Sequence, residues 1–367
     1  MKYLFLNEIM KSILYLSHVS WNWTKQRPQF LAEELSAHNE VFYVQEGSIR
    51  NCPSNNDHKL SFKHLWHIPL SRYGFIRSIN NIIYKIQLFH LCSKSDVIWF
   101  TSPKSYNWIF KKFFQSKIAV YDCMDDMIEL YPSDKKMKEK EAQLYRNAKV
   151  VFSSSAHLSE KLIRRYGDRK ITVVNNAISA NFSDATEQLP SECMKYIDTG
   201  KTIITYIGSI SSWMDFELLK AIKAKFPQIV INLWGPPHDF NIPEHDGINL
   251  CGKVEYKYVS SILSQSDILI MPFVVNELIE SVNPVKLYEY IFSGKPCIAP
   301  KYGESMQFQD YVNLYESHEE CLQQIGKILN SELSQKSIDE CRAFVKNNTW
   351  ENRVEDIKVA LNSIKEL

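Results

Sequence analysis

Two groups of residues in this sequence have the types and spacing needed for chemistry on a phosphorylated ligand. In the first, Lys286, Glu289 and Tyr290 are separated by three and four residues, so they share one face of a predicted helix. A lysine in the first turn of a helix suits a diphosphate. A glutamate one turn further along can accept hydrogen bonds from ribose hydroxyls. The alternative is an ordinary surface helix that carries one lysine and one glutamate.

The surrounding residues predict where this helix begins and ends. Asn283 suits the N-cap position, and Pro284 suits the first helical residue. Gly294 is the expected left-handed residue at the end, with Pro296 just beyond it. Apolar residues at helical spacing predict a second face that packs on a sheet, formed by Leu287, Tyr288, Ile291 and Phe292.

Apolar runs on either side of the helix predict buried strands at 267–273 and 297–300. The helix start then lies in a crevice at the carboxyl ends of parallel strands, where open α/β sheets bind ligands. A further strand is predicted at 202–209. Gly208 ends it and lets the backbone approach a ligand closely.

The second group consists of three carboxylates that follow a predicted strand at 118–122. Asp122, Asp125 and Asp126 gather there, and crowded carboxylates push their pKa values apart. One of them can then act as a base that takes the proton from an acceptor hydroxyl. We predict Asp126 as this base, and Asp125 as the second choice. The alternative is that one aspartate caps a helix and the others form turns.

Length and composition narrow the function classes. The 367 residues suggest two domains. With 43 Lys and Arg against 42 Asp and Glu, the net charge is +1, which disfavours charge-driven nucleic-acid binding. The eight cysteines include no Cys-x-x-Cys pair, so reduced thiols in the cytoplasm fit better than a zinc site or a disulfide scaffold.

No membrane-spanning or secretory segment is expected. No apolar run approaches the roughly 18–20 residues of a spanning helix. Residues 1–10 contain Glu8 and lack a small-residue cleavage site.

The first half of the chain reads as a Rossmann-like domain. A helix begins at Gln26, after a loop at 18–25 that is rich in aromatic and polar groups. No Gly-x-Gly-x-x-Gly occurs, which disfavours an NAD site. The predicted strands are 12–17, 41–44, 96–101, 118–122, 150–155 and 171–177, and helices are predicted at 139–147 and from His157.

Residues 61–92 interleave apolar and basic side chains and contain no acidic residue. A basic amphipathic helix of this kind can lie on an anionic membrane. It can equally be a core helix with solvated lysines, and we favour that core interpretation.

The second half starts over with the same kinds of element. Residues 183–200 are polar and read as a linker. Strands are predicted at 202–209, 230–235, 248–254, 267–273 and 297–300, and helices at 256–265, 316–333, 336–347 and from Thr349.

The motif Pro284-x-Lys286-Leu287-x-Glu289-Tyr290, followed by Gly294-Lys295-Pro296, resembles the nucleotide-sugar signature of GT-B glycosyltransferases of the bacterial exopolysaccharide and teichuronic-acid type (family 4-like). Tyr121-Asp122-x-x-Asp125-Asp126, an Arg27-Pro28-Gln29 helix opening and a Trp350-x-x-Arg353 start to the last helix also resemble this group. One position departs from it. Many retaining members carry a glutamate eight residues before the ribose-binding one, where this chain has Ser281.

The resemblance implies a fold and a set of site residues. The fold is α/β, with two Rossmann-like domains facing a central cleft (GT-B) and a C-terminal helix that crosses back to the first domain. The expected domains are 1–182 with 349–367, which binds the acceptor, and 201–348, which binds the nucleotide sugar. Loop 18–27 is expected to face the cleft and to contribute His18, Trp21 and Arg27. The expected donor residues are Gly208, Ser209, Val254, Tyr256, Asn283, Lys286, Leu287 and Glu289.

The expected activity is transfer of a sugar from a nucleotide diphosphate sugar, with UDP favoured, to a saccharide or lipid-linked acceptor in surface polysaccharide biosynthesis. No metal or resident cofactor is expected, because no paired metal-binding carboxylate lies near the diphosphate. Asp125-Asp126 is a possible exception. The partners are the donor, the acceptor and an anionic membrane surface contacted by 61–92, with a cytoplasmic or peripheral membrane location. The alternatives are a nucleotide-sugar-binding protein without turnover and a nucleotide-sugar epimerase.

Overall fold

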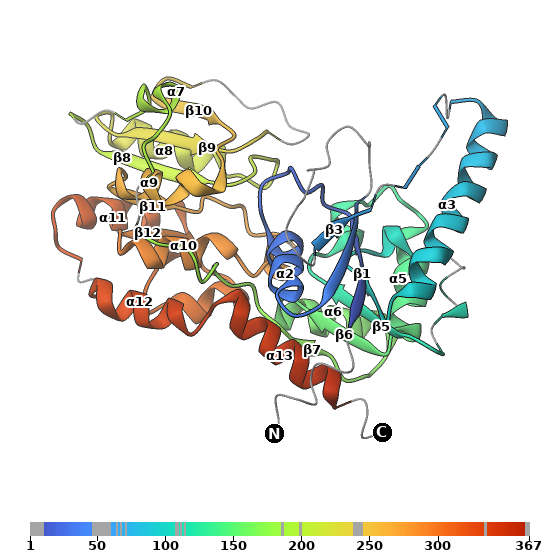
Figure 1. Ribbon diagram of the computed structural model, residues 1–367. Helices are drawn as coiled ribbons and strands as arrows, with labels where there is room; N and C mark the ends of the chain where they lie inside the picture. The colour runs from blue at the N-terminus through green and yellow to red at the C-terminus, as the bar shows by residue number, and fades with distance from the viewer. Residues whose placement is uncertain are drawn as a thin grey trace. The chain divides into compact units, whose positions relative to one another are not determined.

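The computed structural model describes residues 11–45, 60–63, 65–66, 68–69, 72–106, 110, 112–113, 115–184, 187–197, 200–237, 245–333 and 336–363. The chain forms two compact units (Figure 1). The first is Met1–Asn175 with Trp350–Leu367, and the second is Asn176–Thr349. We predicted that residues 1–10 are not a secretory signal, and these residues lie outside the part of the chain that the structure describes.

The first unit is built on a parallel sheet in the order β3-β2-β1-β4-β5-β6-β7. The order reverses beside β1, as in doubly wound folds. The strands are β1 (Ser12–Ser17), β2 (Glu40–Gln45), β3 (Leu60–Phe62), β4 (Val97–Phe100), β5 (Ile118–Cys123), β6 (Val150–Ser153) and β7 (Thr172–Val173). The helices are α2 (Arg27–Ser36), α3 (Gly74–Lys94), α4 (Met127–Leu130), α5 (Met137–Asn147), α6 (Ala156–Tyr166) and α13 (Trp350–Asn362), with a 3₁₀ turn η2 (Pro103–Ser105).

Alternating side chains give this sheet two buried faces. Leu14 and Leu16 point to one face, where Leu88 and Cys92 of α3 complete the core. Tyr15 points to the other face and stacks between two neighbouring rings, with centroid distances of 5.6 Å to Tyr43 and 5.7 Å to Trp99. The register of β1 with β2 and β4 therefore places aromatic rings side by side across three strands.

The terminal helix α13 belongs to the first unit, as predicted. Trp350 is buried and stacks on Phe30 of α2 with a centroid distance of 5.4 Å. The chain therefore returns to the unit in which it began.

The second unit repeats the doubly wound order, β10-β9-β8-β11-β12-β13, with all strands parallel. The strands are β8 (Ile203–Ile207), β9 (Val230–Trp234), β10 (Ile248–Gly252), β11 (Ile268–Ile270), β12 (Cys297–Pro300) and β13 (Asn313–Tyr315). The helices are α7 (Ser191–Met194), α8 (Phe216–Lys225), α9 (Val259–Ser264), α10 (Val285–Ser293), α11 (His318–Leu329) and α12 (Ile338–Lys346), with 3₁₀ turns η4 (Tyr256–Tyr258), η5 (Ile279–Ser281) and η6 (Gly303–Phe308).

The boundary between the units differs from the predicted one. The first unit ends at Asn175 rather than at 182, because Ile178 and Phe182 are buried in the core of the second unit. The predicted linker at 183–200 includes α7, whose Cys193 is buried in the same core. This stretch therefore belongs to the second unit and is not a free linker.

We predicted that residues 61–92 form a core helix, and this prediction is wrong for most of the helix α3. Only Leu88 and Cys92 of α3 are buried, and its other apolar side chains are half-buried or exposed. No helix among the described residues is both long and apolar enough to cross a bilayer.

Candidate functional site

The carboxyl end of β8 and the first turn of α10 meet at Gly208. This glycine has φ +153°, and a Cβ added there would lie 1.9 Å from Cε of Lys286. Only a glycine leaves room for the lysine to pass over the strand end. The structure thus brings together the glycine and the lysine that sequence reasoning grouped.

A second glycine keeps this strand end compact. A Cβ on Gly235, which follows β9, would lie 1.8 Å from the carbonyl oxygen of Gly208. The amide of Gly208 donates to the carbonyl oxygen of Trp234 at 2.8 Å. The ends of β8 and β9 therefore form a close-packed floor beneath Lys286.

Lys286 is a half-buried cation that lies over two aromatic rings. Its Nζ lies 5.6 Å from the ring centroid of Tyr206 and 5.9 Å from that of Phe273. Burial lowers its pKa, and the charge of Glu289 acts in the opposite direction. Lys286 makes no ion pair within 4 Å with any carboxylate in the described part of the chain. Because even partial burial of a charge is costly without a counter-charge, this environment favours an anionic ligand.

Glu289 lies one turn further along α10 and is only 6% exposed. Burial raises its pKa to about 7, and Lys286 and the Tyr256 hydroxyl act in the opposite direction. Tyr290 fixes the same face of the helix, since its hydroxyl accepts from the amide of Ile207 at 2.9 Å. The predicted grouping of Lys286, Glu289 and Tyr290 on one face is confirmed.

The predicted start of α10 is wrong by one residue. Pro284 occupies the N-cap position, and Asn283 caps nothing. The Asn283 Oδ1 accepts from the amide of Asn176 at 2.9 Å, and its carbonyl oxygen accepts from the Asn176 side chain at 2.6 Å. Asn283 therefore ties α10 to the residue at which the second unit begins. Gly294 is left-handed at φ 68°, as predicted.

The other predicted donor residues lie around this floor in different ways. Ser209 follows Gly208, and its carbonyl oxygen accepts from the Tyr206 hydroxyl at 2.8 Å. The Leu287 side chain is fully buried in the core of the second unit and does not point toward the strand end. Val254 and Tyr256 follow β10 and are half-buried, and the Tyr256 ring lies 5.9 Å from that of Phe182.

Ser281 closes η5 and is 1% exposed. Its hydroxyl donates to the carbonyl oxygen of Glu277 at 3.4 Å. This position therefore supplies a small hydroxyl and no carboxylate.

In the first unit, Arg27 lies in the core and not on a loop surface. It is 1% exposed and holds Asp122 through Nε at 3.1 Å and Nη2 at 2.7 Å. Its Nη1 donates to the carbonyl oxygen of Val174 at 2.7 Å. These contacts make Arg27 a buried partner of Asp122. They do not place it on a surface that could bind a sugar acceptor, contrary to the prediction.

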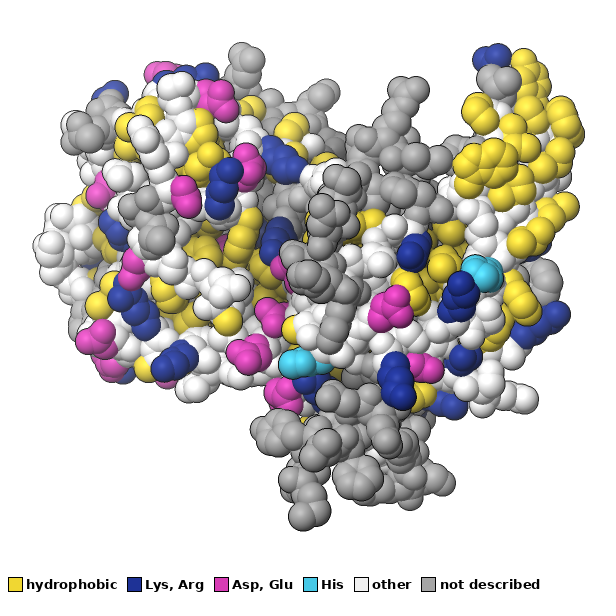
Figure 2. All heavy atoms as spheres, viewed as in Figure 1, with side chains coloured by type: hydrophobic (Ala, Val, Ile, Leu, Met, Phe, Trp, Pro, Cys, Tyr) yellow, Lys and Arg dark blue, Asp and Glu magenta, His cyan; other side chains and the backbone are white. Residues whose placement is uncertain are grey.

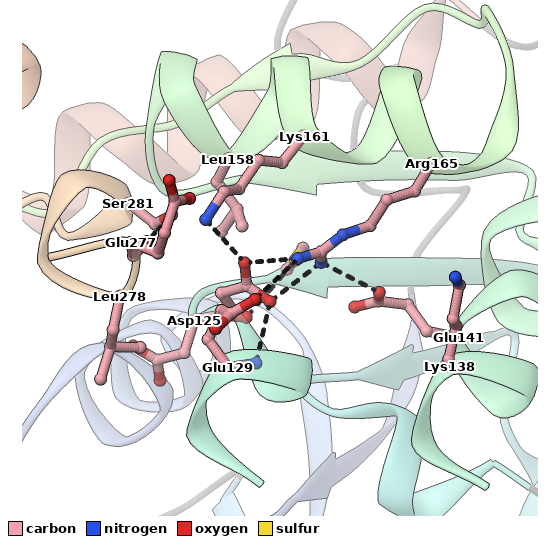
Figure 3. Close-up of polar contacts among 12 residues, drawn as sticks. Asp125, Glu129, Lys138, Glu141, Leu158, Lys161, Arg165, Glu277, Leu278 and Ser281 are labelled. Carbon is pink, nitrogen blue, oxygen red and sulfur yellow. Dashed lines mark hydrogen bonds and ion pairs between the residues drawn. The ribbon is translucent and has the colours of Figure 1, made fainter. Parts of the chain in front are cut away.

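Asp126 is held by two cations of α6. Nη1 and Nη2 of Arg165 lie 2.9 and 2.8 Å from its two oxygens, and Nζ of Lys161 lies 3.1 Å away (Figure 3). Asp126 also caps α4 by accepting from the amide of Glu129 at 3.4 Å. Burial raises its pKa, but Arg165 and Lys161 outweigh burial and hold the pKa below its usual value.

Asp125 is the more basic of the two carboxylates. Burial raises its pKa to about 6, Arg27 opposes the rise, and the charges of Asp126 and Asp122 add to it. A carboxylate with this pKa is deprotonated at neutral pH and still takes up a proton readily. The pairing of Asp126 therefore favours Asp125 as the base, which reverses the order predicted from the sequence.

A buried glutamate, Glu141, lies beside Arg165, one of the two cations that hold Asp126. Glu141 of α5 is fully buried and accepts from the hydroxyls of Tyr121 and Tyr166, each at 2.7 Å. It also lies 3.7 Å from Arg165 (Figure 3). Sequence reasoning missed Lys161, Arg165 and Glu141. The four-residue spacing of Lys161 and Arg165 on one helix face was the available signal.

His18 and Trp21 follow β1 at the point where the strand order reverses. Nδ1 of His18 lies 2.9 Å from Oγ1 of Thr101, which follows β4. Burial and the nearby Lys104 lower the pKa of His18 to about 4, so its ring is neutral at pH 7. Trp21 packs edge-on against Tyr43 and Phe62, with centroid distances of 5.0 and 4.7 Å. Of the three predicted acceptor residues, His18 and Trp21 lie at this edge of the first sheet.

Among the described residues, no group of three His, Cys, Asp or Glu side chains is arranged to hold a metal ion. The seven described cysteines are all free.

Comparison with known proteins adds a distant sequence relative. No protein-family model matches the chain. A Bacillus subtilis (strain 168) protein named, provisionally, as the teichuronic acid biosynthesis glycosyltransferase TuaH is 22% identical over 244 residues. The match covers 59% of this chain and 59% of the relative, so it spans well under two thirds of that protein.

Solved structures match over nearly the whole chain. Sucrose-phosphate synthase from Thermosynechococcus elongatus has a TM-score of 0.67 at 14% identity, covering 97% of this chain and 98% of that one. HepE from Anabaena, in complex with UDP and glucose, has a TM-score of 0.66 at 12% identity, covering 96% and 100%. A UDP-N-acetylglucosamine 2-epimerase, provisionally so named, from Listeria monocytogenes gives 0.54 at 12% identity, covering 97% of each chain. This chain therefore has the two-domain α/β fold of the GT-B glycosyltransferases.

Proposed function

We propose that this protein is a glycosyltransferase that uses a nucleotide diphosphate sugar, with UDP as the favoured nucleotide. The observation that carries the proposal is Lys286, a half-buried cation whose pKa is lowered by desolvation, placed over the Gly208 strand end and without an ion-paired carboxylate in the described chain. A diphosphate supplies the missing counter-charge, and it is also the leaving group that a glycosyltransferase must stabilise.

The remaining donor contacts follow from this placement. Glu289, one turn from Lys286, is assigned to the ribose hydroxyls. The segment after β10, with Val254 and Tyr256, is assigned to the nucleobase. Ser209, Asn283 and Leu287 shape the strand end and the helix start around the diphosphate. HepE, of the same fold, was solved with UDP and glucose, which supports a uridine nucleotide.

The chemistry assigned to the first unit is removal of a proton. The bond from the anomeric carbon to the diphosphate oxygen breaks, and its electron pair leaves with the diphosphate. The acceptor oxygen forms the new bond to that carbon and loses its proton to Asp125. The ion pairs of Asp126 support a structural role for that residue. Ser281, in place of a carboxylate, favours an inverting reaction.

The acceptor is proposed to be a saccharide or lipid-linked saccharide of surface polysaccharide biosynthesis. His18 and Trp21 line the edge of the first sheet assigned to it. The partial match to a teichuronic acid glycosyltransferase supports this class. With a lipid-linked acceptor, we expect the protein to work in the cytoplasm at the inner face of the membrane, and the described residues within 61–92 to supply a basic and apolar surface.

We propose that transfer needs no metal ion, because the leaving group is stabilised by Lys286 and the α10 start. The rate of UDP release with a donor and an acceptor should be unchanged by EDTA. A large loss that Mg²⁺ or Mn²⁺ restores would assign Asp125-Asp126 to a metal instead.

Lys286→Met tests the donor site. Losing a charged hydrogen bond to the diphosphate should weaken UDP binding by roughly 10- to 100-fold, measured by calorimetric titration. The same change should raise the melting temperature of the unliganded protein slightly, since it removes a half-buried charge that has no ion-pair partner in the described chain. Lys295→Met, just beyond the end of α10, is the matched control and should alter neither. Wild-type UDP affinity in Lys286→Met would refute the site.

Turnover distinguishes the two alternatives. A binding protein without turnover would bind UDP through Lys286 but release none from a UDP-sugar in the presence of acceptors. An epimerase, the activity named for one solved neighbour, would change the sugar with no acceptor present. A transferase releases UDP in proportion to the acceptor that it glycosylates.

A further inference from the structure

The helix α3 carries apolar residues on two opposite faces. One face packs on the first unit through Leu88 and Cys92, with Tyr84 and Leu91 partly buried beside them. The opposite face is an apolar stripe of Phe75, Ile79, Ile82, Ile86 and Phe89. At about 100° per residue, the stripe spans an arc of roughly 80° centred opposite the packed face.

The apolar stripe is strongly exposed. Phe75 is 70% exposed, Ile82 57% and Ile86 64%. Figure 2 shows hydrophobic side chains gathered over α3 at the upper right. Isolated exposed apolar residues are normal on a protein surface, but a contiguous patch on one helix face marks an interaction surface.

A tryptophan is fastened beside the stripe. The amide of Trp66 donates to Oε1 of Gln87 at 2.7 Å, and Nε2 of Gln87 donates to the carbonyl oxygen of Trp66 at 2.8 Å. Asn80 holds Ile68 in the same two-bond way, at 2.7 and 2.9 Å. Trp66 is 57% exposed. An exposed, fixed indole is well suited to the headgroup layer of a bilayer.

Charge identifies the partner. Residues 61–94 contain five basic and no acidic side chains, namely Lys63, Arg72, Arg77, Lys85 and Lys94, although the whole chain has a net charge of only +1. Of these, Lys85 and Lys94 lie on either side of the stripe, roughly 80° and 100° from its centre around the helix axis. Basic residues that flank an apolar helix face in this way match an anionic lipid surface. A second copy of this chain is a poor match, because a two-fold contact would bring the same cations together.

We infer that the apolar stripe of α3, with Trp66 beside it, docks the protein onto the surface of an anionic phospholipid bilayer. The helix lies in the plane of the interface, since its opposite face is committed to the protein core. This inference rests on the proposed function only in that a lipid-linked acceptor would lie in the same surface. The contact itself does not require catalysis.

Flotation with vesicles tests the inference on the full chain. The wild type should float with vesicles that contain 30% anionic phospholipid and far less with neutral vesicles. Ile82→Glu combined with Ile86→Glu should reduce the bound fraction at least tenfold. Val359→Glu on α13 is the matched control, because Val359 is also 70% exposed but lies outside the stripe, and it should float like the wild type. Lys85→Gln with Lys94→Gln should weaken binding to anionic vesicles only.

The flotation test and the test of the donor site can fail independently. UDP should raise the melting temperature of the Ile82→Glu, Ile86→Glu variant as it does that of the wild type, which also shows that the variant is folded. Binding of this variant to anionic vesicles at the wild-type level would overturn the inference. A wild-type protein that does not float with anionic vesicles would also overturn it. So would a dimer, detected by sedimentation, that the Ile82→Glu and Ile86→Glu substitutions dissociate, because the stripe would then be the dimer contact.

Discussion

At the scale of residues, the molecule treats two neighbouring aspartates in opposite ways. Asp126 is paired with Arg165 and Lys161 and its pKa is lowered, whereas the pKa of Asp125 is raised to about 6. Their order in the sequence carries no sign of this difference, because the cations come from a helix about 35 residues further along. Adjacent carboxylates can thus divide into a structural and a chemical group.

The pH dependence of transfer should report Asp125. A base must be deprotonated, so the rate should rise with pH through about 6 and level above it. Asp125→Asn should lower the rate constant by about 10²-fold or more. Asp126→Asn removes a negative neighbour and leaves the charges of Arg165 and Lys161 unbalanced, so it should lower the pKa of Asp125. The rise of the rate with pH should then occur at lower pH. If the rate of Asp126→Asn rises with pH over the same range as that of the wild type, Asp125 is not the titrating base.

Glu289 should make the unliganded protein less stable as pH rises. The unfolded chain ionises near 4.5, but the folded chain holds the proton until about 7, so stability falls across that window. The cost at pH 8 is at most about 3 kcal/mol. Glu289→Gln should therefore raise the melting temperature at pH 8 and leave it nearly unchanged at pH 4. Glu217→Gln, on the exposed face of α8, should change it at neither pH.

At the scale of elements, the donor site depends on a strand end that only a glycine allows. Gly208→Ala would drive a Cβ into the side chain of Lys286. We expect this substitution to displace the lysine and weaken UDP binding at least tenfold. Gly167→Ala is the matched control, because Gly167 also has a positive φ (+99°) but nothing within 4 Å of the added Cβ. The control should lose about 1 kcal/mol of stability in urea unfolding and keep its UDP affinity.

The elements that the sequence predicted best are those with strong apolar patterns. The central strands β1, β5, β8 and β12 lie where the buried runs placed them, and Gly294 ends α10 as expected. The edge strands β3 and β13 were missed. Each has three residues, too few for a pattern, and forms because a neighbouring strand offers free hydrogen-bonding groups. The helix α8 was also missed.

The candidate site was predictable where local spacing decides it. Lys286, Glu289 and Tyr290 share a face because helix geometry requires it. Arg27 was misplaced because loop position does not reveal a buried partner such as Asp122. The exposed stripe of α3 was misread for a related reason, since an apolar pattern reports a face without saying what covers it.

At the scale of the whole molecule, each unit has its own hydrophobic core, and all the proposed donor residues lie in the second. Hydrogen exchange should show UDP protecting amides of β8 and α10, with little change in β1 and β5 of the first unit. The comparison of free and UDP-bound protein by mass spectrometry provides the measurement. Equal protection in both units would mean that the nucleotide is not held by the second unit alone.

The bonds between Asn283 and Asn176 have a mechanical consequence. Asn176 is the residue at which the chain passes from one unit to the other, and Asn283 directly precedes the helix that presents Lys286. We expect a shift of α10 on phosphate binding to be felt first at Asn176, because two hydrogen bonds join Asn176 directly to Asn283. The residue at which the second unit begins is thereby hydrogen-bonded to the segment that opens the proposed donor site.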